Sequence, residues 1–288
     1  MTKSNTLIVV AKQPTPRKTK TRLCPPLTFE QAANLYECFL QDTLTIMRSV
    51  PDVRCGIGYL PENAGEYFRQ LAPDMELTPQ QGATLGDRLD NLLRSALNNG
   101  SERVVVFNSD SPTLPAAYLS QAFEELADVD VVLGPTKDGG YYLIGMKQPH
   151  SHLLKQVQMS TPLVLKDTLA LAKSSGLTVS LLPTWYDVDT INDLNLLNDD
   201  LAHKQINGTA ATRRWLSQMD WRRSQTGALS ISLIIPALNE AASLAQLLAE
   251  VPFDFIHQLI VVDNGSTDDT AEVARIAGAH VVNEPRRG

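Results

Sequence analysis

Residues 103–115 read RVVVFNSDSPTLP, and this stretch decides the fold class. Its valines and phenylalanine form a short, continuously apolar strand pattern that runs directly into a polar loop with two prolines. The preceding segment, about 85–98, has apolar residues at helical spacing and ends in NNG, which is typical of a helix C-terminus. Helix, strand and loop in this order indicate an α/β protein.

The same alternation extends in both directions along the chain. Helices are predicted from Thr28, where Gln31 completes a capping box, and from Thr161 with Pro162 at the first helical position. Strands are predicted at TLIVVA (residues 6–11), VDVVLGP, YYLIGM and LTVSLLP. Strands alternating with helices over about 200 residues favour a doubly wound, mostly parallel, Rossmann-like sheet with helices on both faces. Ligands bind such sheets at the carboxyl ends of the strands.

After residue 203 the periodicity fades, and it starts again near residue 229. SLIIPALNE, AASLAQLLAEV, QLIVVDNGSTDD, TAEVARIAGA and HVVNEP read as strand, helix, strand, helix and strand. The predicted organisation is a first α/β domain at 1–203, a helical linker at 204–228 and an incomplete second α/β unit at 229–288. The second unit, of about 60 residues, is shorter than the usual ~100 or more of a domain.

Composition excludes several classes of protein. The 288 residues carry a formal net charge of -7, which argues against a nucleic-acid binder. No apolar run approaches the roughly 18 to 20 residues of a membrane span, and no signal peptide opens the chain, so a cytoplasmic location is expected. The three cysteines lack metal-site spacing and are expected to be reduced.

A basic stretch, KQPTPRKTKTR at residues 12–22, contrasts with the acidic chain as a whole. Because it follows the first strand, it should lie at the ligand-binding edge of the sheet. There its cations, the hydroxyls of Thr19 and Thr21 and free loop amides form a cradle for a phosphate chain. A solvated, flexible charged loop is the alternative. Glycine is absent from the stretch, so it is not a Walker motif.

Acidic residues follow two other strands. Asp110 either caps a turn or holds a divalent cation, since Mg²⁺ takes one or two protein carboxylates and completes its shell with phosphate and water. In DVDTINDL, one of Asp187 and Asp189 is expected to cap the helix that starts near Thr190, and the other to complete the metal site. Asp138, Gly139 and Gly140 form either a place of close ligand approach or a plain hairpin turn.

The motifs LIVVAKQPTPRKTKTRLCPPL, NSDSPTLP, GPTKDGGYYLIGM and DVDTINDL, in this order, resemble a bacterial family of the nucleotide-diphospho-sugar transferase (GT-A) superfamily. That family is described as glycosyltransferases or as a domain of unknown function. It is similar to phospholactate guanylyltransferases and molybdenum-cofactor nucleotidyltransferases. The resemblance covers about residues 5 to 200.

The resemblance implies roles for particular residues. Asp110 and Asp189 match catalytic metal ligands for Mg²⁺ or Mn²⁺, with Asp187 a less favoured ligand. Asp138, Gly139 and Gly140 match an acceptor pocket. The phosphate-binding loop is matched by Lys12, Arg17, Lys20 and Arg22. Residues 229–288 resemble the start of a family 2 glycosyltransferase, which implies nucleotide binding by Asn239, Glu240 and Asp263.

These features predict an Mg²⁺-dependent transferase with a nucleotide-activated donor. Glycosyl transfer from a nucleotide sugar to a small acceptor is favoured over nucleotidyl transfer from a nucleoside triphosphate with release of pyrophosphate. Both reactions use the same electrostatic clamp on phosphate. A third reading, from another class, is a non-catalytic nucleotide-binding regulatory module. No partner nucleic acid and no membrane span are expected.

Overall fold

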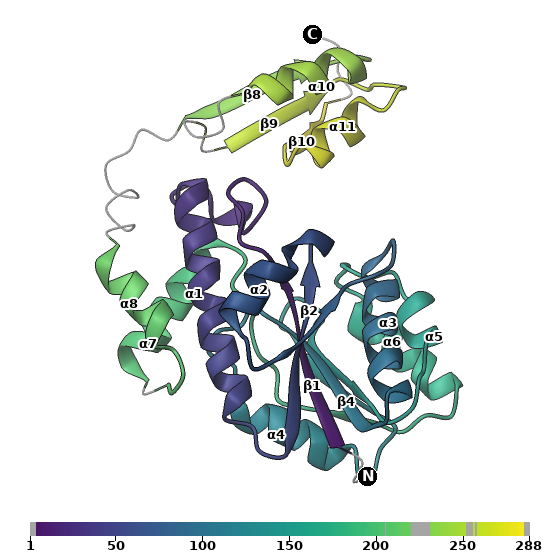
Figure 1. Ribbon diagram of the computed structural model, residues 1–288. Coiled ribbons are helices and arrows are strands. Elements are labelled where there is room, and N and C mark those ends of the chain that lie inside the picture. Colours follow the sequence, from purple (N-terminus) through teal and green to yellow (C-terminus); the bar gives the residue numbers. More distant parts are fainter. Residues whose placement is uncertain (1–3, 205, 220–230, 252–255, 257, 285–288) are drawn as a thin grey trace. The chain divides into compact units, whose positions relative to one another are not determined.

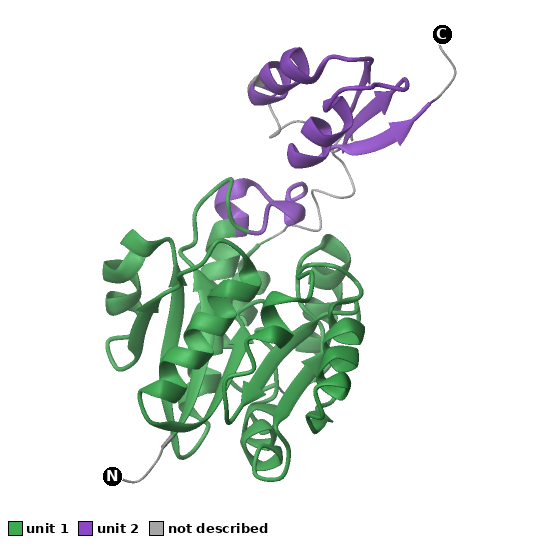
Figure 2. Ribbon diagram, turned by 90° about the vertical axis from the view of Figure 1, so that its right-hand side faces the viewer, with its two compact units in different colours: residues 1–19, 33–219 green, residues 20–32, 220–288 purple. Residues whose placement is uncertain are grey.

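The computed structural model describes residues 4–204, 206–219, 231–251, 256 and 258–284. The chain divides into two compact units, which Figure 2 shows in different colours. Unit 1 consists of residues 1–19 and 33–219, and unit 2 of residues 20–32 and 220–288. The predicted domain limits stay predictions. Residues 205 and 220–228 of the predicted linker lie outside the described residues.

Unit 1 is built on a seven-stranded sheet in the order β3-β2-β1-β4-β6-β5-β7. The strands are β1 (Ser4–Lys12), β2 (Val53–Leu60), β3 (Glu76–Pro79), β4 (Ser101–Asn108), β5 (Val131–Pro135), β6 (Tyr141–Met146) and β7 (Val179–Leu181). β1 pairs in parallel with β2 on one side and β4 on the other. Only β6 runs antiparallel to its neighbours among the described strands. The prediction of a mostly parallel sheet is confirmed.

The direction of β6 follows from the shortness of its connection. Only residues 136–140 separate β5 from β6, and a parallel connection needs a crossover of a dozen or more residues. The two strands therefore form a hairpin, and β6 inserts between β5 and β4. As a result, the carboxyl end of β5 and the start of β6 lie at the same edge of the sheet as the carboxyl ends of β1 and β4.

Helices cover both faces of the large sheet (Figure 1). One face packs against α3 (Leu85–Asn98), α5 (His152–Lys155) and α6 (Val164–Ser174), whose leucines share a buried cluster with Ile8, Val104 and Val106. On the other face lie α1 (Phe29–Arg48) and α4 (Ala116–Glu125). The remaining helical segments of this part of the chain are η1 (Thr21–Leu23), η2 (Glu62–Ala64), α2 (Gly65–Leu71), α7 (Ile191–His203) and α8 (Ala210–Gln218).

Threonine capping boxes begin several helices. At α1, Thr28 and Gln31 exchange hydrogen bonds as the sequence predicts, with the Thr28 N–H 2.8 Å from Gln31 Oε1. Boxes of the same kind begin α3 at Thr84 and α7 at Thr190. The prediction for α6 is wrong, because Thr161 donates its hydroxyl to the Gln158 carbonyl and the helix begins only at Val164.

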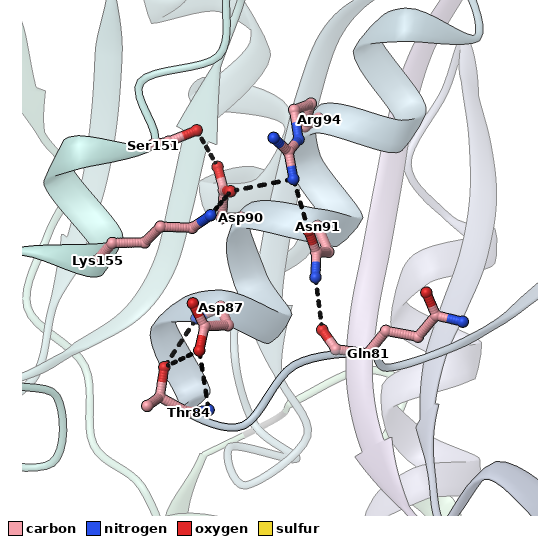
Figure 3. A network of polar contacts seen from close by, with 8 residues as sticks. All are labelled: Gln81, Thr84, Asp87, Asp90, Asn91, Arg94, Ser151 and Lys155. Atoms are coloured by element: carbon pink, nitrogen blue, oxygen red, sulfur yellow. Dashed lines mark hydrogen bonds and ion pairs between the residues drawn. The ribbon is translucent and has the colours of Figure 1, made fainter.

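A buried carboxylate joins α3 to α5 (Figure 3). Asp90, 2% exposed, accepts a hydrogen bond from the Ser151 hydroxyl at 2.5 Å. Its other oxygen lies 3.0 Å from Lys155 Nζ and 3.5 Å from Arg94 Nη2. The two cations are about 40% exposed, so they stay partly solvated while they neutralise a charge that burial alone would disfavour.

The same network extends to the loop that follows β3. Arg94 donates to Asn91 Oδ1 at 2.7 Å, and Asn91 Nδ2 donates to the Gln81 carbonyl at 2.7 Å (Figure 3). Gly86 brings the first turn of α3 against α5, since a Cβ at this position would lie 2.1 Å from the Leu154 carbonyl oxygen. The loop at 80–84 is therefore held at the carboxyl edge of the sheet by side chains of α3.

A second buried carboxylate anchors α8 to α1. Asp42, 2% exposed, accepts hydrogen bonds from the N–H groups of Ala211 and Thr212 at 2.9 and 2.8 Å, which closes the N-terminus of α8. Burial raises the pKa of Asp42, and these hydrogen bonds partly oppose that rise. The helical part of the predicted linker is thus docked on unit 1 at least through Met219.

Unit 2 contains a small parallel sheet in the order β10-β9-β8. Its elements are β8 (Ser232–Ala237), α10 (Ala241–Glu250), β9 (Gln258–Asp263), α11 (Thr270–Ile276) and β10 (His280–Asn283). Leu244, Leu248 and Ala274 of the helices pack on Leu259 and Val261 of the central strand. The predicted second α/β unit is confirmed. Within the described part of the chain, no helix is both long and apolar enough to cross a membrane.

We expect Asp90→Ala to lower the free energy of unfolding by about 2 kcal/mol, because it removes charge-assisted hydrogen bonds from a buried position. Urea denaturation measures this change. Glu124→Ala, at an exposed position of α4, serves as the control and should change it by less than about 0.5 kcal/mol. Equal losses in the two variants would show that the Asp90 network contributes nothing specific to stability.

Candidate active site

The carboxyl ends of β1 and β4 lie side by side, and they carry two of the predicted site segments. Val10 of β1 is in register with Asn108 of β4, so the loops that follow Lys12 and Asn108 leave the sheet together. Parallel strands place their carboxyl ends at one edge by geometry alone. The predicted phosphate-binding and metal-binding loops therefore start as neighbours.

A buried hydroxyl network joins these two loops. Tyr36 of α1 and Ser109 share a 2.6 Å hydrogen bond between their hydroxyl groups. The Tyr36 hydroxyl also accepts from the Lys12 N–H at 3.2 Å, and the Ser109 hydroxyl contacts the Val10 carbonyl at 2.9 Å. Because Tyr36 and Ser109 are 4% and 2% exposed, this network fixes the backbone of Lys12 relative to that of Asp110.

The segment that contains Asp187 and Asp189 lies against the Asp110 loop. The Val188 N–H donates to the Asp110 carbonyl at 3.0 Å. The structure therefore brings the chain at Asp110 and Asp189 together, although they are 79 residues apart in sequence. Neither Asp187 nor Asp189 caps α7, contrary to the prediction, because the Thr190 side chain accepts from the Asp193 N–H in that role.

The first half of the basic stretch forms a turn that its own hydrogen bonds close. The Thr15 N–H donates to the Thr19 hydroxyl at 3.0 Å, and the Lys18 and Thr19 N–H groups donate to the Thr15 carbonyl. Lys12 and Arg17 are exposed, whereas Thr19 is 6% exposed. The Thr19 hydroxyl thus helps to hold the loop together, and its predicted contact with phosphate stays a prediction.

The second half of the stretch groups with unit 2. Lys20 precedes the short helix η1, and its carbonyl accepts the Leu23 N–H at 3.0 Å. Arg22, in the last turn of η1, is exposed. Lys20 and Arg22 remain predicted phosphate ligands, and only Lys12 and Arg17 lie in the same unit as Asp110.

The turn at Asp138, Gly139 and Gly140 is closed by its own hydrogen bonds. Asp138 Oδ1 accepts from the Thr136 hydroxyl at 2.5 Å and from the Gly140 N–H at 3.2 Å. Gly139 has a φ of 92°, and a Cβ there would lie 2.0 Å from the Pro162 carbonyl oxygen. The glycine therefore permits a close approach to Pro162, and the acceptor role of the turn stays a prediction.

Aromatic side chains stand beside this turn. Trp185 pairs with Thr136 in a parallel bridge, and its ring contacts Tyr118 and Tyr186. Burial raises the pKa of the Tyr186 hydroxyl, which therefore stays protonated. Lys137 Nζ lies 5.8 Å from the centroid of the Tyr186 ring, so a cation lies beside these aromatic side chains, next to the predicted acceptor turn.

The divalent cation predicted at this edge stays a prediction, and it would be shared with phosphate. Among the residues that the structure describes, no three His, Cys, Asp or Glu side chains are grouped so as to hold a metal alone. Asp110 and Asp189 supply two carboxylates on adjacent segments, and Mg²⁺ typically takes one or two of these and completes its octahedron with phosphate oxygens and water. The donor set therefore suits a metal that arrives with a nucleotide.

In unit 2 the three predicted nucleotide-binding residues meet at one edge. Ala237 at the end of β8 is in register with Asp263 at the end of β9. The Asn239 N–H donates to the Ser266 hydroxyl at 2.9 Å, and the Ser266 N–H donates to Asp263 Oδ1 at 3.0 Å. The Glu240 N–H is bonded to the Thr270 hydroxyl at 2.8 Å. Their assignment to nucleotide binding remains a prediction.

Sequence reasoning missed the residues that organise the site of unit 1. They are Tyr36, Asn108, Ser109 and Ser111. The polar run NSDS after a strand signalled the last three, but their partners come from distant segments. Tyr36 has no such signal, because it stands at an apolar position of an amphipathic helix.

We expect Gly139→Ala to lower the free energy of unfolding by about 2 kcal/mol or more, since the positive φ and the clash with Pro162 both oppose a side chain. Thermal or urea unfolding measures the loss. Gly140→Ala is the matched control, because its added Cβ meets only side-chain atoms, the closest being Thr136 Oγ1 at 3.0 Å. If the two variants were equally stable, the contact with Pro162 would not be what requires glycine.

Comparisons with known proteins agree with this architecture. Residues 43–161 match a family described as an uncharacterized protein conserved in bacteria (DUF2064), and residues 232–288 match glycosyl transferase family 2. An uncharacterized glycosyltransferase of Mycobacterium tuberculosis H37Rv is 49% identical over 59 residues, which are 20% of this chain and 26% of that protein. A 4,4'-diaponeurosporenoate glycosyltransferase of Staphylococcus haemolyticus is 43% identical over 72 residues, 25% and 19% of the two chains. The chain thus spans about a quarter or less of the length of these curated relatives.

Solved structures cover much more of the chain. A synthase of 4-diphosphocytidyl-2C-methyl-D-erythritol from Anaerococcus prevotii shares the fold, with a TM-score of 0.50 and 13% identity over 70% of this chain and 97% of that one. A protein of Desulfovibrio desulfuricans G20, described as a nucleotide-diphospho-sugar transferase, is 31% identical with a TM-score of 0.72. It covers 77% of this chain, and 98% of its own length is matched. By this match and by its fold, the chain belongs to the nucleotide-diphospho-sugar transferase (GT-A) superfamily.

Proposed function

We propose that unit 1 is an Mg²⁺-dependent transferase that transfers a glycosyl group from a nucleotide sugar to a small acceptor. One observation carries the proposal. The parallel pairing of β1 with β4 places a basic loop beside an aspartate-bearing loop, and the segment of Asp189 is bonded to the latter. Positive side chains and metal-binding carboxylates at one edge are what a nucleoside diphosphate leaving group requires.

Each group has a defined task in this proposal. Lys12 and Arg17 neutralise phosphate oxygens, while Asp110 and Asp189 hold the cation. When bound, Mg²⁺ or Mn²⁺ supplies charge stabilisation to the diphosphate as the glycosidic bond to the donor sugar breaks. The acceptor hydroxyl attacks the anomeric carbon, the nucleoside diphosphate leaves and the hydroxyl proton passes to solvent, so the protein needs no covalent nucleophile. The turn of Asp138 and the aromatic side chains of Trp185 and Tyr186 are proposed to bind the acceptor.

The attached second unit favours glycosyl over nucleotidyl transfer. Residues 232–288 match a family of glycosyl transferases, and the Desulfovibrio desulfuricans protein is described as a nucleotide-diphospho-sugar transferase. A nucleotidyltransferase would use the same clamp on a triphosphate and release pyrophosphate. The two reactions are therefore distinguished by their products.

A product screen tests the proposal directly. The full chain is incubated with nucleotide sugars or nucleoside triphosphates, with and without Mg²⁺, in the presence of a panel of sugar and phosphorylated small acceptors. Release of a nucleoside diphosphate from a nucleotide sugar is expected. Release of pyrophosphate from a triphosphate would instead establish nucleotidyl transfer. Nucleotide binding that survives Asp110→Ala without any turnover would identify a regulatory module.

Asp110→Ala should lower metal-dependent turnover by about 100-fold or more, as expected when a ligand of a catalytic cation is lost. Initial rates measured across a range of Mg²⁺ concentrations test this. Asp128→Ala, an exposed carboxylate before β5 at the opposite edge of the sheet, is the control and should retain the wild-type rate. Full activity of Asp110→Ala would remove Asp110 from the metal site.

Lys12→Ala and Arg17→Ala should each raise KM for the nucleotide donor about 10-fold, the effect of losing one hydrogen bond to a charged group. The increase should shrink at high ionic strength, since screening weakens the same contacts in the wild type. Lys173→Ala, exposed at the far end of α6, controls for the loss of a positive charge. A KM unaffected in both loop variants would mean that the basic loop does not contact phosphate.

A further inference from the structure

Asp187 lies on the same segment as Asp189, and its carboxylate accepts two hydrogen bonds from the Asp110 loop. Oδ1 accepts a hydrogen bond from Asn108 Nδ2 at 2.9 Å and another from the Ser111 hydroxyl at 2.7 Å. These two donors flank Asp110 on either side in the sequence. One carboxylate oxygen therefore binds the Asp110 loop through a residue on each side of Asp110.

The orientation of Asn108 is fixed by the same loop. Its Oδ1 accepts the Asp110 N–H at 3.2 Å, so its Nδ2 is the end that faces Asp187. Ser111 is 4% exposed, and its hydroxyl also contacts the Tyr186 carbonyl at 2.9 Å. The contacts run in sequence from the backbone of Asp110 through Asn108 to Asp187.

We propose that Asp187 is a positioning residue, which holds the Asp110 loop against the segment of Asp189 and is not a third metal carboxylate. The effect of Asp187 on catalysis rests on the proposed function of unit 1 as a transferase. The structural role does not depend on that function. An acceptor oxygen at residue 187 keeps the Val188 N–H bonded to the Asp110 carbonyl, 3.0 Å away. This oxygen satisfies the Asn108 amide donor, which is costly to leave without an acceptor, while the Ser111 hydroxyl also has the Tyr186 carbonyl within 2.9 Å.

This role requires an acceptor atom, whereas metal ligation requires the negative charge. Asparagine at residue 187 keeps a carbonyl oxygen for Asn108 and Ser111 and loses the charge. Alanine loses both. The same change two residues later, Asp189→Asn, is the matched comparison, because it removes the charge from a proposed metal ligand.

The first measurement is turnover as a function of Mg²⁺ concentration. Asp187→Asn should retain at least about a third of wild-type kcat with an unchanged Mg²⁺ requirement, whereas Asp187→Ala should lose about 10- to 100-fold in kcat, as outer-shell variants do. Asp189→Asn should raise the half-saturating Mg²⁺ concentration about 10-fold or more. If Asp187→Asn raised it as much as Asp189→Asn does, Asp187 would be a metal ligand and the proposal would be wrong.

The second measurement needs no activity. Amide hydrogen exchange at Val188 should accelerate about 10-fold in Asp187→Ala, the size expected for one lost hydrogen bond, and stay within about 3-fold of wild type in Asp187→Asn. Ser111→Ala removes one of the two donors and provides a milder variant if Asp187→Ala does not fold. Its Val188 exchange should lie between those of wild type and Asp187→Ala.

Turnover and amide exchange test two different claims, the transferase function and the positioning role of Asp187. A wild-type chain that releases no product with any nucleotide contradicts the proposed transferase, and the exchange rates still decide the role of Asp187. Wild-type exchange at Val188 in both Asp187→Ala and Ser111→Ala would overturn the positioning role, whatever the activity of the chain.

Discussion

The parallel pairing of β1 with β4 is the constraint on which the rest of unit 1 depends. Their register puts Val10 opposite Asn108, so the loops that follow these strands emerge as neighbours. Tyr36 and Ser109 then lock the two loops through buried hydroxyl groups. A shift of one residue in this register would turn the strand side chains to the opposite faces and separate the basic loop from the aspartates.

The sequence was sufficient to predict the α/β architecture, the second α/β unit and the capped start of α1, because these depend on local patterns. The start of α6 was not predictable, since Thr161 bonds to the preceding turn instead of capping the helix. Antiparallel β6 corresponds to one of the two readings of Asp138, Gly139 and Gly140, a hairpin turn, and the short connection of residues 136–140 gives the reason.

For the candidate site, the sequence identified the charged residues and missed those whose hydrogen bonds fix the loops. Lys12 ends one strand and Asp110 follows another, so both stand out from an apolar pattern. The bonds of Asp187 to Asn108 and of Ser151 to Asp90 join residues 79 and 61 positions apart, and no local pattern encodes such a pair. A close approach such as that of Gly139 to Pro162 depends on the packing of two loops, which only the folded chain defines.

One consequence of the crossover arrangement concerns the electric field at the ligand edge. α3, α4 and α7 all begin at the edge where the parallel strands end, so their N-termini face the same region. Each helix contributes a macrodipole equivalent to about half a positive elementary charge there. These backbone partial charges partly offset the carboxylates at this edge, including Asp87 and Asp193 in the capping boxes of α3 and α7, and they would persist even if the basic side chains were replaced.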